Sequence, residues 1–162
     1  MFKFFKKTNL SELIKAPISG KCIPLEEVKD EVFSSKMIGD GIAIDSTGDI
    51  VYAPADGTIA TIVSSKHAVG MQLNNGVEIL IHVGLETVEL KGEGFTLLVN
   101  VNDKVKEGTP LIKIDRAFIE SKGMSLVTPV IIIESEKYDI DKCAIGQEVY
   151  GGKNTVIEYR VK

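Results

Sequence analysis

The chain has 162 residues, of which 44% are hydrophobic and 26% are charged, the ordinary range for one globular domain with a core of its own. Its formal net charge is −4 and no basic face gathers along it, which argues against a nucleic-acid binder. Two cysteines, Cys22 and Cys143, are too few and too far apart for a disulfide scaffold or a zinc knuckle. We expect them to be reduced, buried and inert, in a cytoplasmic protein.

The first seven residues, MFKFFKK, mix aromatic side chains with lysines. Their apolar run is too short for a secretory signal or a membrane span. We therefore expect residues 1–15 to form a flexible tail with weak or no membrane contact, and residues 16–162 to form a single domain.

Two short stretches begin in the same way, with Ala-Pro followed by a glycine and β-forming residues, at residues 16–23 and 53–60. A repeated strand start favours an internally repeated sandwich. Between these stretches a Gly-Asp-Gly turn at residues 39–41 leads into a short strand at residues 42–44.

Three β runs follow at residues 58–63, 67–73 and 77–83, and an Asn-Gly turn at Asn75 predicts that the last two form a hairpin. Beyond them we expect a strand-turn-strand unit, one helical turn and two further β stretches, at residues 105–114, 118–122, 127–134 and 146–162. Pro129 places the start of its strand at an edge or a bulge. The pattern predicts an all-β, antiparallel sandwich with one or two short helical turns.

The chain contains two histidines, His67 and His82, on neighbouring β runs. Alternation along residues 77–83 puts His82 on the same face as Glu78 and Leu80, and the other positions on the opposite face. Counting outward from the Asn-Gly turn places His82 opposite Ala68 or Val69, so the two imidazoles could meet across the ladder.

A neutral imidazole offers one nucleophilic nitrogen and one N–H, and its unperturbed pKa of ~6.5 keeps it mostly neutral in the cytoplasm. A pair held in this way suits a metal ligand, a general base or a phosphoryl acceptor with a neighbouring donor. The pattern alone is equally consistent with two ordinary buried histidines that have no chemical role.

Three motifs make the chain from about residue 16 onward resemble the glucose-family IIA component of the bacterial phosphoenolpyruvate-dependent sugar phosphotransferase system. They are GDGIAI at residues 39–44, PADGTI at residues 54–59 and HVGLETVELKGEGF at residues 82–95. The resemblance implies an antiparallel β-sandwich of internally repeated hybrid-motif type, with no cofactor. It also implies a phosphocarrier that accepts a phosphoryl group from the protein HPr and passes it to a cysteine of a sugar-permease IIB domain.

By the same resemblance, His82 is the phosphoryl acceptor, and the Gly84 carbonyl orients its ring. His67 stabilises the phosphoryl group and is itself oriented by the hydroxyl of Thr58. Because the acceptor cysteine belongs to the partner, neither cysteine of this chain is assigned a role. No metal is required, although zinc could be held by His67 and His82 with a carboxylate from a partner.

The family also docks its partners on an apolar ring around the two histidines. The matching positions here are Val32, Phe33, Met37, Ile38, Val69 and Leu80, with the rim acids Asp30 and Glu86 facing basic residues of HPr. At every one of these positions the alternative is plain core packing.

Three other functions remain alternatives at this stage. A zinc hydrolase would add a carboxylate such as Glu86 to the two histidines, although no H-x-H or H-E-x-x-H spacing is present. A biotinyl or lipoyl carrier would need a modified lysine on a hairpin tip, for which Lys36 is a poor match. A purely regulatory module would use phosphorylation, and regulatory partners, only as a signal.

Overall fold

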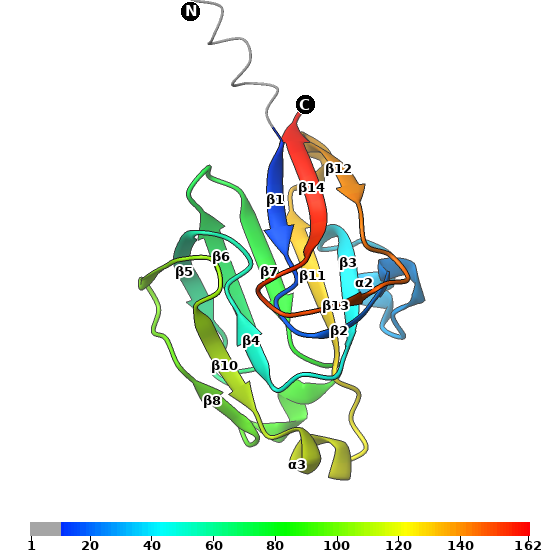
Figure 1. The fold of residues 1–162 in the computed structure, drawn as a ribbon. Helices are drawn as coiled ribbons and strands as arrows, with labels where there is room; N and C mark the ends of the chain where they lie inside the picture. The colour runs from blue at the N-terminus through cyan, green and yellow to red at the C-terminus, as the bar shows by residue number, and fades with distance from the viewer. Residues whose placement is uncertain (1–10) are drawn as a thin grey trace, which may run out of the picture.

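Antiparallel strands make up most of the regular structure in the computed structural model, which describes residues 11–162 (Figure 1). The strands are β1 (Glu12–Lys15), β2 (Gly20–Pro24), β3 (Gly39–Ser46), β4 (Ile50–Tyr52), β5 (Gly57–Ile62), β6 (Ala68–Leu73), β7 (Glu78–His82), β8 (Phe95–Leu97), β9 (Lys104–Val105), β10 (Pro110–Ile114), β11 (Val127–Ile133), β12 (Tyr138–Lys142), β13 (Glu148–Val149) and β14 (Thr155–Val161). The helical segments are α2 (Glu31–Ser34), α3 (Arg116–Ser121) and the 3-10 turns η1 (Leu25–Glu27), η2 (Thr87–Leu90) and η3 (Ser135–Lys137).

The strands form three sheets. An eight-stranded sheet has the order β13-β2-β3-β11-β7-β6-β5-β9, and two three-stranded sheets have the orders β4-β10-β8 and β1-β14-β12. In Figure 1 the β1–β14 pair lies at the end of the molecule opposite to α3. This arrangement confirms the expected all-β sandwich, and the helical segments are more numerous than expected but all short.

Aliphatic side chains fill the space between the sheets. On β7, Ile79 and Ile81 are 1% and 0% exposed, whereas Glu78, Leu80 and His82 on the alternate positions are exposed or half-buried. A strand with one face in the core keeps its register, because a slip of one residue would expose every apolar side chain. The core therefore fixes which residues of β7 face outward.

Two expectations about the chain need correction. Residues 12–15 are not part of a flexible tail: they form β1, which pairs with β14 and buries Ile14 completely. The rest of the proposed tail, residues 1–10, lies outside the described residues. β11 is an internal strand between β3 and β7, although Pro129 pairs with β3 just before the pairing with β7 begins.

Among residues 11–162, no helix has the length and the apolar character that crossing a membrane would require.

Candidate active site

The β6–β7 hairpin determines the position of His82. In its ladder Ala68 lies opposite His82, which confirms the register counted from the turn. At that turn the Asn75 carboxamide accepts a hydrogen bond from the Val77 N–H (3.1 Å) and donates one to the Tyr159 hydroxyl (2.7 Å). The turn is thus held to the sheet, and His82 reaches the far end of the hairpin, where β7 stops.

His67 comes just before β6, in a bend, and not within the ladder. Lys66 in front of it has a left-handed φ of +64°, so the alternation of the strand does not extend back to His67. The Val83 N–H donates to the His67 carbonyl oxygen at 2.7 Å and joins the two segments. The imidazole centroids of His67 and His82 lie 4.7 Å apart, with their planes 77° apart.

The backbone that follows β7 orients the His82 ring. Nδ1 of His82 lies 2.8 Å from the carbonyl oxygen of Gly84. A carbonyl can only accept a hydrogen bond, so Nδ1 carries the proton and the lone pair of the neutral ring is on Nε2. Gly84 has a φ of +83°, and a Cβ there would come within 2.6 Å of Thr87 Cγ2 and 2.7 Å of the Ser125 carbonyl oxygen. Only glycine fits this turn.

His67 is 5% exposed, and its Nδ1 is the only buried side-chain nitrogen or oxygen without a hydrogen-bond partner among the residues described. An unpaired buried nitrogen costs free energy, and within residues 11–162 only the Ser65 backbone, which raises the pKa of this ring, offsets that cost.

The expectation that Thr58 orients His67 is wrong. Thr58 pairs with Gln72 on β6, and Gln72 lies five residues beyond His67, roughly 17 Å along an extended strand. Ser65 occupies the bend two residues before His67, and its backbone lies close enough to the ring to affect the pKa of that histidine.

Two phenylalanines flank the pair of imidazoles. The Phe33 ring of α2 lies 4.9 Å from the His82 ring, and the Phe95 ring of β8 lies 6.5 Å from the His67 ring, centroid to centroid. The four rings form a row from α2 to β8 that keeps water away from the inner sides of the imidazoles.

Burial lowers the pKa of both histidines. For His67 burial is the largest cause, followed by repulsion from His82, and the Ser65 backbone opposes both. For His82 burial again dominates, and the Gly84 carbonyl and the Asp30 carboxylate oppose it. Both rings are therefore neutral at pH 7, and neutral imidazole is the nucleophilic form.

The predicted docking positions divide into three groups. Val32 and Met37 are 42% and 74% exposed, as a docking surface requires. Ile38 and Leu80 are half-buried against a small cluster that contains Phe33. Val69 is 0% exposed and faces the main core, so its place in the ring is wrong. Phe33 itself is 4% exposed and forms the wall behind His82.

The two rim acids lie on turns beside the site. Asp30 is the N-cap of α2, and its carboxylate accepts a hydrogen bond from the Val32 N–H at 3.0 Å. Glu86 is exposed, with a left-handed φ of +62°, in the segment between β7 and η2.

No group of three or more histidine, cysteine, aspartate or glutamate side chains in residues 11–162 is arranged to hold a metal ion. Glu86 therefore does not complete a three-ligand site with the two histidines, as the zinc hydrolase alternative needs.

The two cysteines differ in burial. Cys22 is buried, and burial raises the pKa of its thiol to about 11, so this thiol stays protonated. Cys143 is exposed, which corrects the expectation that both are buried.

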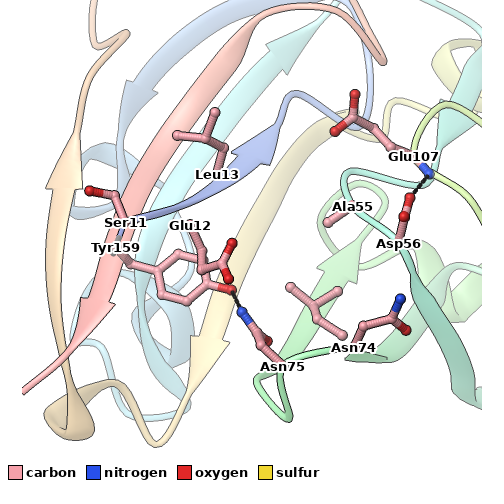
Figure 2. A pocket seen from close by; sticks show the side chains of 10 residues that line it. Ser11, Glu12, Leu13, Ala55, Asp56, Asn74, Asn75, Glu107 and Tyr159 are labelled. Atoms are coloured by element: carbon pink, nitrogen blue, oxygen red, sulfur yellow. Dashed lines mark hydrogen bonds between the residues drawn. The ribbon is translucent and has the colours of Figure 1, made fainter. Parts of the chain in front are cut away.

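A pocket of about 440 Å³ lies at the opposite end of the β6–β7 hairpin (Figure 2). Its lining consists of Ser11, Glu12, Leu13, Ala55, Asp56, Leu73, Asn74, Asn75, Glu107 and Tyr159. Two hydrogen bonds join its lining residues: the Asn75 carboxamide donates to the Tyr159 hydroxyl, and the Asp56 carboxylate accepts from the Glu107 N–H at 2.8 Å. Neither imidazole lines this pocket.

Comparison with known proteins gives a consistent result. The EIIA 1 family of the phosphoenolpyruvate-dependent sugar phosphotransferase system matches residues 12–138. The PTS system glucose-specific EIIA component of Bacillus cereus is 41% identical over 162 residues, which cover 100% of this chain and 98% of the relative. Among solved structures, glucose permease IIA from Mycoplasma capricolum has a TM-score of 0.86 and 36% identity, with 93% and 96% of the two chains covered.

The PTS system mannose-specific EIIBCA component of Corynebacterium glutamicum is 50% identical over 125 residues, or 77% of this chain. The matched part is only 18% of that longer relative.

Proposed function

Because the chain belongs to the EIIA 1 family of the phosphoenolpyruvate-dependent sugar phosphotransferase system, we propose that His82 is the residue that carries the phosphoryl group. As a family member the chain is a phosphocarrier of this system. One observation supports the choice of His82 most directly: the Gly84 carbonyl holds its Nδ1–H and leaves the Nε2 lone pair free.

In the acceptance step, the Nε2 lone pair attacks the phosphorus of a phosphohistidine on the donor protein. A new P–N bond forms at His82, and the P–N bond of the donor breaks and returns its electron pair to the donor imidazole. Nδ1 keeps its proton throughout, bound to the Gly84 carbonyl, so no general base is needed. In the donation step a partner thiolate attacks the same phosphorus, and His82 is the leaving group.

His67 has the position of a stabilising donor. Its ring lies edge-on to His82, 4.7 Å between centroids, so its N–H can point at phosphoryl oxygens on Nε2 of His82. A dianionic phosphoryl group beside His67 raises the pKa of this ring, opposing the effect of burial. His67 then becomes the positive charge that balances the group during transfer.

The proposed partners are HPr as donor and a permease IIB domain as acceptor. The name of the Corynebacterium relative, EIIBCA, joins the A component to B and C components in one protein, which supports a IIB partner. The exposed side chains of Val32 and Met37 and the rim acids Asp30 and Glu86 are the proposed contacts, with Ile38 and Leu80 at their base. A glucose-type sugar and a cytoplasmic location are parts of the same proposal.

The test is incubation of the purified chain with phosphoenolpyruvate, Enzyme I and HPr, followed by peptide mapping of the label. We expect one acid-labile, base-stable phosphoryl group on the peptide that contains His82. Label on another residue, or none while HPr itself becomes labelled, would disprove the assignment.

A further inference from the structure

We propose that Thr87 is a positioning residue for the phosphoryl acceptor, acting through the turn that carries the Gly84 carbonyl. This inference rests on the proposed role of His82. The Thr87 hydroxyl is bonded to the backbone and not to the imidazole, and the side chain contacts the turn between β7 and η2 in two ways.

The first contact is a hydrogen bond. The Thr87 hydroxyl donates to the Val83 carbonyl oxygen at 2.7 Å, within a side chain that is 0% exposed. Val83 is the residue between His82 and Gly84, and its N–H is bound to the His67 carbonyl at 2.7 Å. The hydroxyl therefore fixes the peptide group that directly precedes Gly84.

The second contact is the packing of the Thr87 methyl group beside Gly84. The Thr87 methyl group, Cγ2, lies 2.6 Å from the point where a Cβ on Gly84 would stand. On the other side of the turn the Leu85 N–H donates to the Ser125 carbonyl at 3.0 Å. The peptide group between Gly84 and Leu85 is thus held at both ends: its N–H by Ser125 and its oxygen by Nδ1 of His82.

The direction of the Gly84 carbonyl determines which ring nitrogen of His82 accepts the phosphoryl group, and these contacts hold that carbonyl in place. If the Gly84 oxygen turned away, the neutral His82 ring could place its proton on Nε2 and lose the outward lone pair. Substitution of a residue that orients a functional histidine typically lowers activity by roughly tenfold to a hundredfold. The buried hydroxyl of Thr87 keeps the turn from relaxing.

The chain offers a matched control. Thr128 on β11 is also 0% exposed, and its hydroxyl also donates to a backbone carbonyl, that of Leu126, at 3.0 Å. Replacement of either threonine by valine removes one buried hydroxyl at almost constant volume. Only Thr87→Val removes a bond to the turn beside His82.

The experiment compares Thr87→Val, Thr87→Ser and Thr128→Val in the full chain. The measurements are the initial rate of phosphoryl acceptance from HPr and the ¹⁵N ring signals of His82. For Thr87→Val we expect an acceptance rate about tenfold lower and a shift of His82 toward the Nε2–H tautomer. Thr87→Ser, which keeps the hydroxyl, and Thr128→Val should both match the unsubstituted chain in rate and in ring signals.

Normal acceptance and unchanged ring signals in Thr87→Val would overturn the inference, and so would an equal loss of rate in Thr128→Val. If Thr87→Val does not fold, Thr87→Cys replaces it, because a thiol is a weak donor of similar size. An acceptance rate below that of Thr87→Ser, by up to about tenfold, supports the role. An unchanged acceptance rate refutes it. The unsubstituted chain tests the proposed function separately, since it must accept label on His82 whatever Thr87 does.

Discussion

The two ends of the β6–β7 hairpin differ in how their polar atoms are paired. At the turn end, the Asn75 side chain binds both the Val77 N–H and the Tyr159 hydroxyl. At the histidine end, Nδ1 of His67 is buried with no partner, while Nε2 of His82 has no hydrogen-bond partner among the side chains and backbone described. The Asn75 side chain at the turn end thus has hydrogen-bond partners, whereas these two ring nitrogens at the histidine end have none in the described part of the chain.

This difference teaches where the protein keeps its capacity to bind. A buried polar atom without a partner costs about 1–3 kcal/mol, and folding tolerates such a cost chiefly at functional positions. The pocket at the turn end has a volume of about 440 Å³, yet its Asn75 and Tyr159 side chains already bind each other (Figure 2). Hollow volume is therefore a poorer guide to this active site than unsatisfied hydrogen bonding.

The largest expected effect comes from His82→Gln. Removal of the nucleophile should lower phosphoryl acceptance from HPr by at least about 1,000-fold. Labelling from phosphoenolpyruvate measures the loss. Residual acceptance at more than a few per cent of the normal rate would show that another residue takes the group.

His67→Gln should separate acceptance from donation. The variant still accepts the group on His82, but we expect the rate of donation to the IIB cysteine to fall by roughly 100- to 1,000-fold. The reason is that the phosphoryl oxygens lose the hydrogen-bond donor that stabilises their negative charge in the transition state. Single-turnover transfer from the labelled protein to an isolated IIB domain measures this step. A normal rate of donation would remove His67 from the mechanism.

Glycines at the two ends of the hairpin allow a direct comparison of strain and crowding. Gly76 at the turn has a φ of +93° and open space around its Cβ position, so Gly76→Ala should lower the free energy of unfolding by only about 1–2 kcal/mol. Gly84→Ala adds a collision with Thr87 and Ser125 and should cost a further 1–3 kcal/mol or so. Urea unfolding of both variants checks the order, and equal losses would contradict the packing described.

The pH dependence follows from the lowered pKa values of both rings. Because burial lowers them below the ordinary value of ~6.5, the rings stay neutral somewhat below that pH, and acceptance is lost only as the pH falls through the lowered pKa. The unfolded chain takes up protons first, so stability also declines as the pH falls below ~6.5. NMR titration of the ring C–H signals measures both values, and a pKa above 6.5 for either unphosphorylated ring would contradict this account.

The smallest effect is expected at the turn end. Tyr159→Phe removes the hydrogen bond from Asn75 and should cost about 1 kcal/mol of stability while phosphoryl acceptance stays unchanged. The same labelling assay measures acceptance in this variant. A clear loss of acceptance would mean that the two ends are coupled.

Much of this architecture could be predicted from the sequence, because strong local signals set it. The Asn-Gly turn fixed the register that places His82 opposite Ala68, and the alternation of apolar residues showed which face of β7 is buried.

Other features depend on backbone that no simple period describes. His67 reaches His82 only because Lys66 adopts a left-handed conformation, which is uncommon for lysine. The positions of Thr58 and Val69 were inferred from the family resemblance, but pairing across the sheet puts Thr58 opposite Gln72 and Val69 in the core. The proximity of the Ser65 backbone to His67 and the bond from Thr87 to Val83 appear only when the bends around the two imidazoles are known.

The most direct test of the central claim is to find the ring nitrogen that carries the phosphoryl group. The chain, labelled with ¹⁵N-histidine, is phosphorylated through HPr and its imidazole signals are assigned. We predict that the group is bonded to Nε2 of His82 and that Nδ1 keeps its proton. A group on Nδ1 of His82, or on His67, would contradict the account.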